Sequence, residues 1–165
     1  MRVGDIAAAV GKGLFAGAVG TAAMTVSSTL EAKLRGREPR AAPVAAAGKV
    51  LGVQPRNPAG RERFASVVHW TYGTAWGGMR GLLDAAGLGS RTAPLAHFAA
   101  VWGTEQVILP ALAVAPPLKQ TPARETAFDV LHHGVYAIAT SLAYAAMQES
   151  RPEFRRFATW HTRHP

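Results

Sequence analysis

Hydrophobic residues fall into four long windows that are separated by polar stretches. Each window holds about 20 mostly apolar residues, which is the length of helix that crosses the hydrocarbon core of a bilayer. The pattern therefore predicts an all-α protein, a four-helix transmembrane bundle. The windows cover residues 6–30, 64–83, 93–116 and 125–147, within one membrane domain over residues 1–150 that is followed by a basic and aromatic tail over residues 151–165.

The first window is rich in alanine and glycine and carries a single charge, Lys12, near its start. Glycines spaced three or four apart allow the backbones of two membrane helices to approach closely. A cleaved signal peptide is the alternative for this window, although the apolar run is longer than a typical signal. The glycines expected at helix contacts are Gly13, Gly17, Gly20, Gly73 and Gly77.

Three connections join the windows. Residues 31–63 are rich in arginine and proline and hold one short helix, residues 44–51, which we expect at the membrane surface. Residues 84–92 are short and rich in glycine, as in a tight helical hairpin. Basic residues divide almost evenly between the two predicted sides, with a small excess that places residues 31–63 in the cytoplasm.

Charge and composition narrow the class of protein. The chain has 18 lysines and arginines against 10 acids, and this balance of +8 favours an anionic partner, either nucleic acid or a phospholipid surface. The basic residues lie in the connections and the tail, so we expect the lipid bilayer of the plasma membrane as partner and no nucleic acid. The absence of cysteine excludes disulfide scaffolds, zinc fingers and iron–sulfur sites. A soluble helical bundle is the alternative, since alanine-rich helices also build soluble proteins.

Two short patterns recur and suggest a duplicated two-helix hairpin. FAGAVGT at residues 15–21 matches FAAVWGT at residues 98–104, and a histidine stands three residues before a tyrosine at both His69 and His133. The chain would then consist of two tandem hairpins in the same orientation. Chance similarity is the alternative in a chain so rich in alanine and glycine.

Polar side chains occur at a similar predicted depth in several windows. At 1.5 Å of rise per residue, the three histidines of the second and fourth windows lie about 8 to 12 Å from the side of residues 31–63. Glu105 enters from the other side and reaches about the same level. Because ionisable groups at this depth are costly in lipid, they usually face one another inside the bundle. We therefore expect Glu105 to contact at least one of the histidines in a polar cluster of His69, Tyr72, Glu105, His132, His133 and Tyr136.

Three roles are open to this cluster. It could fix the register of the helices in a structural or accessory protein, relay a proton or ion through Glu105 and the histidines, or bind a metal ion or haem. Imidazole and carboxylate suit zinc, iron or copper, and haem would need His69 opposite His132 or His133. The leading expectation is the structural role with no cofactor and no enzyme activity, since no nucleophile elbow, P-loop or HExxH pattern occurs. The candidate metal ligands are His69, Glu105, His132 and His133.

Other residues are assigned local roles. Asp129, near the start of the fourth window, is expected to cap the helix and interact with its dipole. His97 is expected at the opposite membrane interface, and Trp102 is expected to pack or to lie at an interface. The glycines and the tail favour association into a homodimer or a larger membrane complex.

Several segments together resemble a family of small four-span membrane proteins of high-GC actinobacteria that has no assigned activity. The resemblance extends over most of the chain between Gly13 and Tyr144 and implies the four-span fold. Its segments contain every residue of the predicted polar cluster, but they imply no catalytic role for any of them. The segments are GTAAMT, GREPRAAP, HWTYGTAWGGMRGLL, HFAAVWGTEQVILPALAVAPP and FDVLHHGVYAIATSLAY.

Overall fold

The computed structural model describes residues 2–37 and 42–149, so the predicted tail at residues 151–165 lies outside the described residues. The described chain is helical and contains no strand, which confirms the all-α prediction. In chain order the elements are α1 (Val3–Arg35), α2 (Ala42–Leu51), α3 (Pro58–Ala85), α4 (Thr92–Ala111), the short 3₁₀ helix η1 (Leu118–Gln120) and α5 (Ala123–Glu149).

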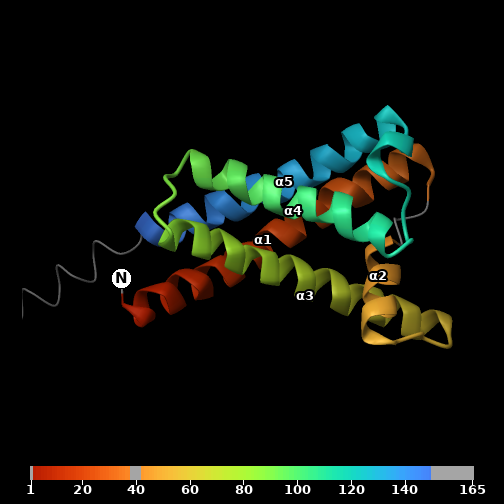
Figure 1. Ribbon diagram of the computed structural model, residues 1–165, viewed down its shortest axis with the longest axis horizontal. Helices are drawn as coiled ribbons and strands as arrows, with labels where there is room; N and C mark the ends of the chain where they lie inside the picture. Colours follow the sequence, from red (N-terminus) through yellow and green to blue (C-terminus); the bar gives the residue numbers. More distant parts are fainter. Residues whose placement is uncertain (1, 38–41, 150–165) are drawn as a thin grey trace, which may run out of the picture.

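Four long helices, α1, α3, α4 and α5, run up and down beside one another (Figure 1). Helix α1 packs against α3 and α5, and α4 contacts the same two helices. One end of the molecule carries α2, η1, the last turn of α1 and the first turn of α5, and we call it the α2 end (Figure 1). The opposite end carries the start of α1 and the connection between α3 and α4.

The predicted windows coincide with the four long helices, except that the third window is too long. Helix α4 ends at Ala111, five residues before the predicted end. Pro110 lies in its last turn, and Ala113 has a φ of 50°, in the left-handed region that few residues with a side chain adopt. The chain therefore turns away from the helix although the residues that follow are still apolar.

Glycines allow α1 and α3 to meet backbone to backbone. A Cβ atom built on Gly17 would lie 2.7 Å from the Cα atom of Gly77, and one built on Gly77 would overlap the carbonyl oxygen of Gly13. A side chain on Gly73 would overlap the Thr21 hydroxyl in the same interface. The five glycines expected at helix contacts therefore lie at such contacts, with Gly20 facing α5.

The two hairpins that the repeat would pair do not have matching environments. Tyr136 is buried and donates a hydrogen bond to the carbonyl oxygen of Gly73 at 2.6 Å. Tyr72, its counterpart in the repeat, is 49% exposed and packs its ring against Trp76. The shared spacing of a histidine three residues before a tyrosine therefore does not place Tyr72 and Tyr136 in equivalent environments.

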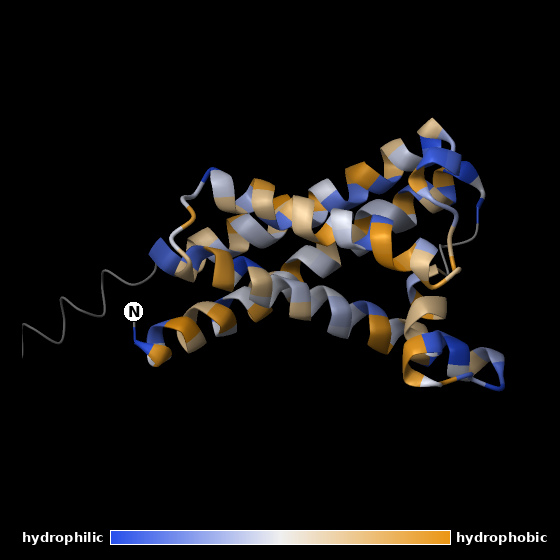
Figure 2. Cartoon of the chain, in the orientation of Figure 1, coloured by the Kyte–Doolittle hydropathy of each residue, from blue (hydrophilic) through white to orange (hydrophobic). Residues whose placement is uncertain are grey.

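Small and polar side chains fill much of the interior, and many large apolar side chains lie on the surface. Apart from two tyrosines, the buried apolar side chains are mostly alanines, and ionisable or hydroxyl side chains are buried beside them. Large apolar side chains point outward along the helices, while hydrophilic segments gather towards the ends (Figure 2). The exposed apolar residues include Phe15, Val26, Leu30, Val67, Leu95, Val107, Ile138 and Leu142.

Of the helices described, α1 is long and apolar enough to cross a membrane by length and composition. Helices α3, α4 and α5 have the length of a span, but their polar residues keep them from being apolar enough, so the predicted four-span bundle is not confirmed. Many of these polar residues belong to the buried faces, for example Arg80 on α3, His97 on α4 and His133 on α5.

Candidate functional site

Helix α5 presents a continuous polar face to the other helices. Buried residues recur on it every three or four positions, which is the spacing of one face of an α-helix. Because neighbouring residues differ by about 100° around a helix, His132 and His133 point to different partners. The buried residues of this face are Asp129, His132, His133, Tyr136, Ala137, Thr140, Ser141 and Tyr144.

His133 contacts Glu105 of α4 in the interior. Its Nε2 atom lies 2.7 Å from Oε2 of Glu105, and its Nδ1 atom lies 2.9 Å from the carbonyl oxygen of Asp129. A carbonyl oxygen only accepts, so Nδ1 carries a proton and donates it to Asp129. At hydrogen-bond distance from the carboxylate, Nε2 must then share one further proton with Glu105. The pair thus holds one proton between the imidazole and the carboxylate.

Asp129 completes this group through its carboxylate, which corrects the expectation that it caps the helix. Its Oδ2 atom accepts a hydrogen bond from Nε1 of Trp102 at 2.9 Å and a longer one from Nε2 of Gln106 at 3.4 Å. Asp129 is 9% exposed and lies in the second turn of α5, so it is held by α4 and not by the start of its own helix. We call Glu105, Asp129 and His133 the acid–histidine cluster, because one ligand atom from each lies within 4.8 Å of the others.

A small cavity lies beside Glu105 and Asp129, on the side of the α2 end. Its volume is about 50 Å³, and Glu105 and Asp129 are among the residues that line it. The remaining lining comes from the end of α4, the connection through η1 and the start of α5, including Pro110, Leu118 and Thr126. The cavity has room for one or two water molecules or for a small cation with its water.

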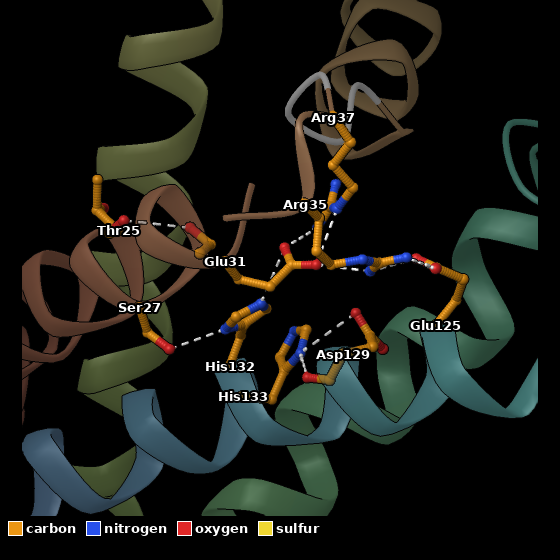
Figure 3. Close-up of polar contacts among 10 residues, drawn as sticks. Thr25, Ser27, Glu31, Arg35, Arg37, Glu125, Asp129, His132 and His133 are labelled. Carbon is orange, nitrogen blue, oxygen red and sulfur yellow. Dashed lines mark hydrogen bonds and ion pairs between the residues drawn. The ribbon is translucent and has the colours of Figure 1, made fainter. Parts of the chain in front are cut away.

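A network of ion pairs lies at the α2 end, next to the cluster along α5. Arg35 forms ion pairs with Glu31 of its own helix, at 2.6 Å, and with Glu125 of α5, and it lies between the two acids (Figure 3). Arg37 forms a second ion pair with Glu31. The network fastens the end of α1 to the start of α5. The sequence pattern predicted no role for these residues, because each lies outside an apolar window or at its edge.

Glu31 lies just beyond the apolar stretch over residues 6–30, and its side chain is buried. The hydrogen bond from Arg37 lowers the pKa of Glu31 to about 2, and Arg35 acts in the same direction against the effect of burial. Glu31 is therefore ionised at any physiological pH.

His132 faces α1 and not α4. Its Nδ1 atom is 2.9 Å from the Ser27 hydroxyl, and its Nε2 atom is 3.7 Å from the Glu31 carboxylate (Figure 3). His132 therefore belongs to the α2-end network and is not a ligand of the acid–histidine cluster.

His69 also contacts α1 and not the cluster, and Tyr72 is not one of its ligands. The Thr25 hydroxyl donates to the carbonyl oxygen of Thr21, so His69 Nε2 donates to Thr25, at 2.8 Å. His69 thus links α3 to α1, whereas His133 links α5 to α4. Nitrogens of His69, His132 and His133 are hydrogen-bonded to Thr25, Ser27 and Glu105 respectively, and these bonds do not suit the haem ligation considered for His69 with His132 or His133. Tyr72 is half-exposed with its ring against Trp76, whereas the next residue, Gly73, is the one that faces α1.

The opposite end of the molecule holds a second polar group that sequence analysis missed. Arg80 is 4% exposed, its guanidinium lies 4.5 Å from the centre of the Tyr144 ring, and the Tyr144 hydroxyl donates to Asp84 at 3.0 Å. His97 is completely buried and donates from Nε2 to the carbonyl oxygen of Trp76 at 2.9 Å, which corrects its expected place at an interface. The sequence feature that could have indicated this group is Arg80, a charged residue within the apolar window over residues 64–83.

Comparison with protein-family models, with curated proteins and with solved structures found no match. The site must therefore be interpreted from its own geometry.

Proposed function

We propose that this protein is a multi-pass membrane protein with four spans, α1, α3, α4 and α5, and that its interior carries a cation pathway from the α2 end to the acid–histidine cluster. Each of the four helices has at least 20 residues, about 30 Å of rise, which matches the hydrocarbon core of a bilayer.

The polarity of the molecule supports the membrane part of the proposal. In water, exposed large apolar side chains along every long helix would favour aggregation, whereas in lipid they contact acyl chains at no cost. Membrane helices associate through small residues and interhelical hydrogen bonds, and α1 and α3 meet through glycines. Hydrophilic segments lie towards the ends, where headgroups and water would meet them (Figure 2).

The observation that carries the cation pathway is the contact between Glu105 and His133 beside a cavity. Ionisable residues in a membrane usually face the protein interior and mark routes for ions or protons. Here an imidazole and a carboxylate lie 2.7 Å apart, and the cavity lined by Glu105 and Asp129 extends from them towards the α2 end. The charged residues that line the cavity are Glu105 and Asp129, so a cation in the cavity would lie beside two carboxylates.

Ion flux in proteoliposomes tests the proposal. We expect vesicles that contain the protein to take up protons or divalent cations faster than protein-free vesicles under an imposed potential, as reported by dyes inside the vesicles. Glu105→Gln should reduce the flux at least tenfold, because glutamine keeps the shape of the side chain but neither binds nor exchanges a cation. The matched control is Glu62→Gln, which neutralises an exposed glutamate of α3 and should leave the flux unchanged.

A wild type no more permeable than protein-free vesicles would contradict the pathway. The cluster would then serve to fix the register of α4 against α5 in a structural or accessory protein. In that case Glu105→Gln should cost only about 1 kcal/mol of stability, because the glutamine retains most of the hydrogen bonding.

A further inference from the structure

We propose that Glu105, Asp129 and His133 bind one divalent transition-metal cation such as Zn²⁺ or Fe²⁺, which enters through the cavity at the α2 end. This inference rests on the proposed cation pathway and names the class of cation that the pathway takes. It replaces the ligand set expected from the sequence, since His69 and His132 lie elsewhere and Asp129 takes their place.

The ligand atoms are close enough to share one ion. One nitrogen and two carboxylate oxygens lie within 4.8 Å of one another. Ligands bound at about 2.0 to 2.2 Å are separated by at most about 4.4 Å across one metal ion. Small rotations of the Glu105 and Asp129 side chains therefore bring all three onto a single cation.

The surroundings of the ligands hold them in the orientation that a metal site needs. A histidine that binds a metal commonly donates its second ring N–H to a backbone carbonyl or carboxylate, which fixes the ring. His133 does so, with Nδ1 donating to Asp129 O at 2.9 Å and Nε2 directed at Glu105. A ligating carboxylate is usually hydrogen-bonded as well. Trp102 supplies that bond to Asp129 from α4.

Charge and access agree with a divalent cation. Two carboxylates and one neutral imidazole balance two positive charges in an interior where a net charge is costly. The cavity of about 50 Å³ reaches Glu105 and Asp129, and it leaves room for water as a further ligand. At 1.5 Å per residue, Glu105 lies about 9 Å from the last residue of α4 and Asp129 about 9 Å from the first residue of α5, both at the α2 end. A cation that enters there has about this distance to travel.

The donor atoms also select among cations. Mg²⁺ and Ca²⁺ prefer oxygen ligands alone, whereas imidazole suits zinc, copper, iron and nickel. The mixed set of one nitrogen and two oxygens therefore favours a borderline transition metal over the alkaline earths.

Metal binding to the purified full-length protein tests the inference. The protein carries a tag without histidine, is stripped with a chelator in detergent, and is titrated with ZnCl₂ by calorimetry and with CoCl₂ by visible absorption. We expect wild type to bind one more equivalent of zinc than Glu105→Gln or Asp129→Asn, and to show Co²⁺ absorption bands that both variants lose. Tail histidines are the same in every variant, so any zinc that they bind cancels in the comparison.

A positioning role for Trp102 gives an independent readout. Trp102→Phe keeps the ring packing but removes the hydrogen bond to Asp129, so we expect zinc affinity to fall about 10- to 100-fold with one equivalent still bound. The Co²⁺ bands should shift while helix content by circular dichroism stays at the wild-type value. The matched controls are Asp84→Asn and His69→Gln, an acid and a histidine outside the cluster, and both should bind zinc as wild type does.

Two results would overturn the metal site. One is a wild type that binds no more zinc than Glu105→Gln. The other is an equal loss of zinc binding in Asp84→Asn and His69→Gln, which would show that zinc binds at another site or that its binding depends only on an intact fold. Either result is compatible with proton flux through the same cavity, so failure of the metal site is distinguishable from failure of the pathway. Zinc binding without any cation flux would instead contradict the pathway alone.

Discussion

At the residue scale, the partners of a buried side chain depend on its direction as well as on its depth. Depth follows from counting residues along a straight helix, and this count was sufficient to predict that Glu105 meets a histidine. Direction does not follow from counting, because His132 and His133 have nearly the same depth and face different helices. The sequence pattern therefore predicted the level of the site but not which histidine belongs to it.

Asp129 illustrates why part of the site could not be predicted. An acid in the first turns of a helix is most often explained by the helix dipole. Its observed partner, Trp102, lies 27 positions earlier on a different helix, and their contact depends on how α4 and α5 align. Nothing in the sequence alone sets that alignment.

The ionised state of Glu31 predicts a pH dependence of stability. Its pKa is about 2 in the folded protein and near the ordinary value of 4.5 when unfolded, so folding favours the ionised form. The stabilisation from the ion pairs with Arg35 and Arg37 is therefore complete above pH 4.5 and is lost as the pH falls from 4.5 towards 2. Melting temperatures of wild type and Glu31→Gln in detergent should accordingly differ most above pH 4.5 and converge near pH 2. A difference that stays constant over this range would contradict the ion-pair network.

At the scale of elements, the helices were predictable and their ends were less so. The apolar windows lie within α1, α3 and α5 and miss the ends of these helices by a few residues. A run of about 20 mostly apolar residues without a proline is readily recognised as one long helix. The end of α4 was misplaced because Ala113 starts a turn within apolar sequence. The glycine spacing correctly indicated a close contact, since only glycine leaves room for two backbones to touch, as at Gly13 and Gly77.

Replacement of one interface glycine tests the packing of α1 on α3. Gly77→Ala places a methyl group against the backbone of α1, which cannot move aside as a flexible side chain would, so we expect a loss of about 1 to 3 kcal/mol of stability. The control is Gly134→Ala on α5, where the added methyl group meets no atom within 4 Å and alanine favours the helix by up to about 1 kcal/mol. Unfolding of the two variants in detergent should therefore shift in opposite directions, and a Gly77→Ala protein as stable as wild type would refute this packing.

At the scale of the whole molecule, the glycines pack within one chain. Gly13, Gly17, Gly73 and Gly77 all contribute to the contact between α1 and α3, so they are not available to a second copy. Association with another copy or with a larger membrane complex stays a prediction, and these glycines do not support it. The buried polar residues of α3, α4 and α5 also lower the mean hydropathy of these helices, and of the described helices α1 alone is long and apolar enough to cross a membrane.

The central claim is that four spans surround a polar interior. The most direct test is to determine on which side of the membrane each connection lies. The chain has no cysteine, so single cysteines can be placed at exposed positions: Arg56→Cys between α2 and α3, Ser90→Cys between α3 and α4, and Lys119→Cys between α4 and α5. A membrane-impermeant maleimide applied to oriented vesicles should label positions 56 and 119 from the same side and position 90 only from the other. Labelling of all three positions from one side, or recovery of the protein in the supernatant without detergent, would contradict the four-span arrangement.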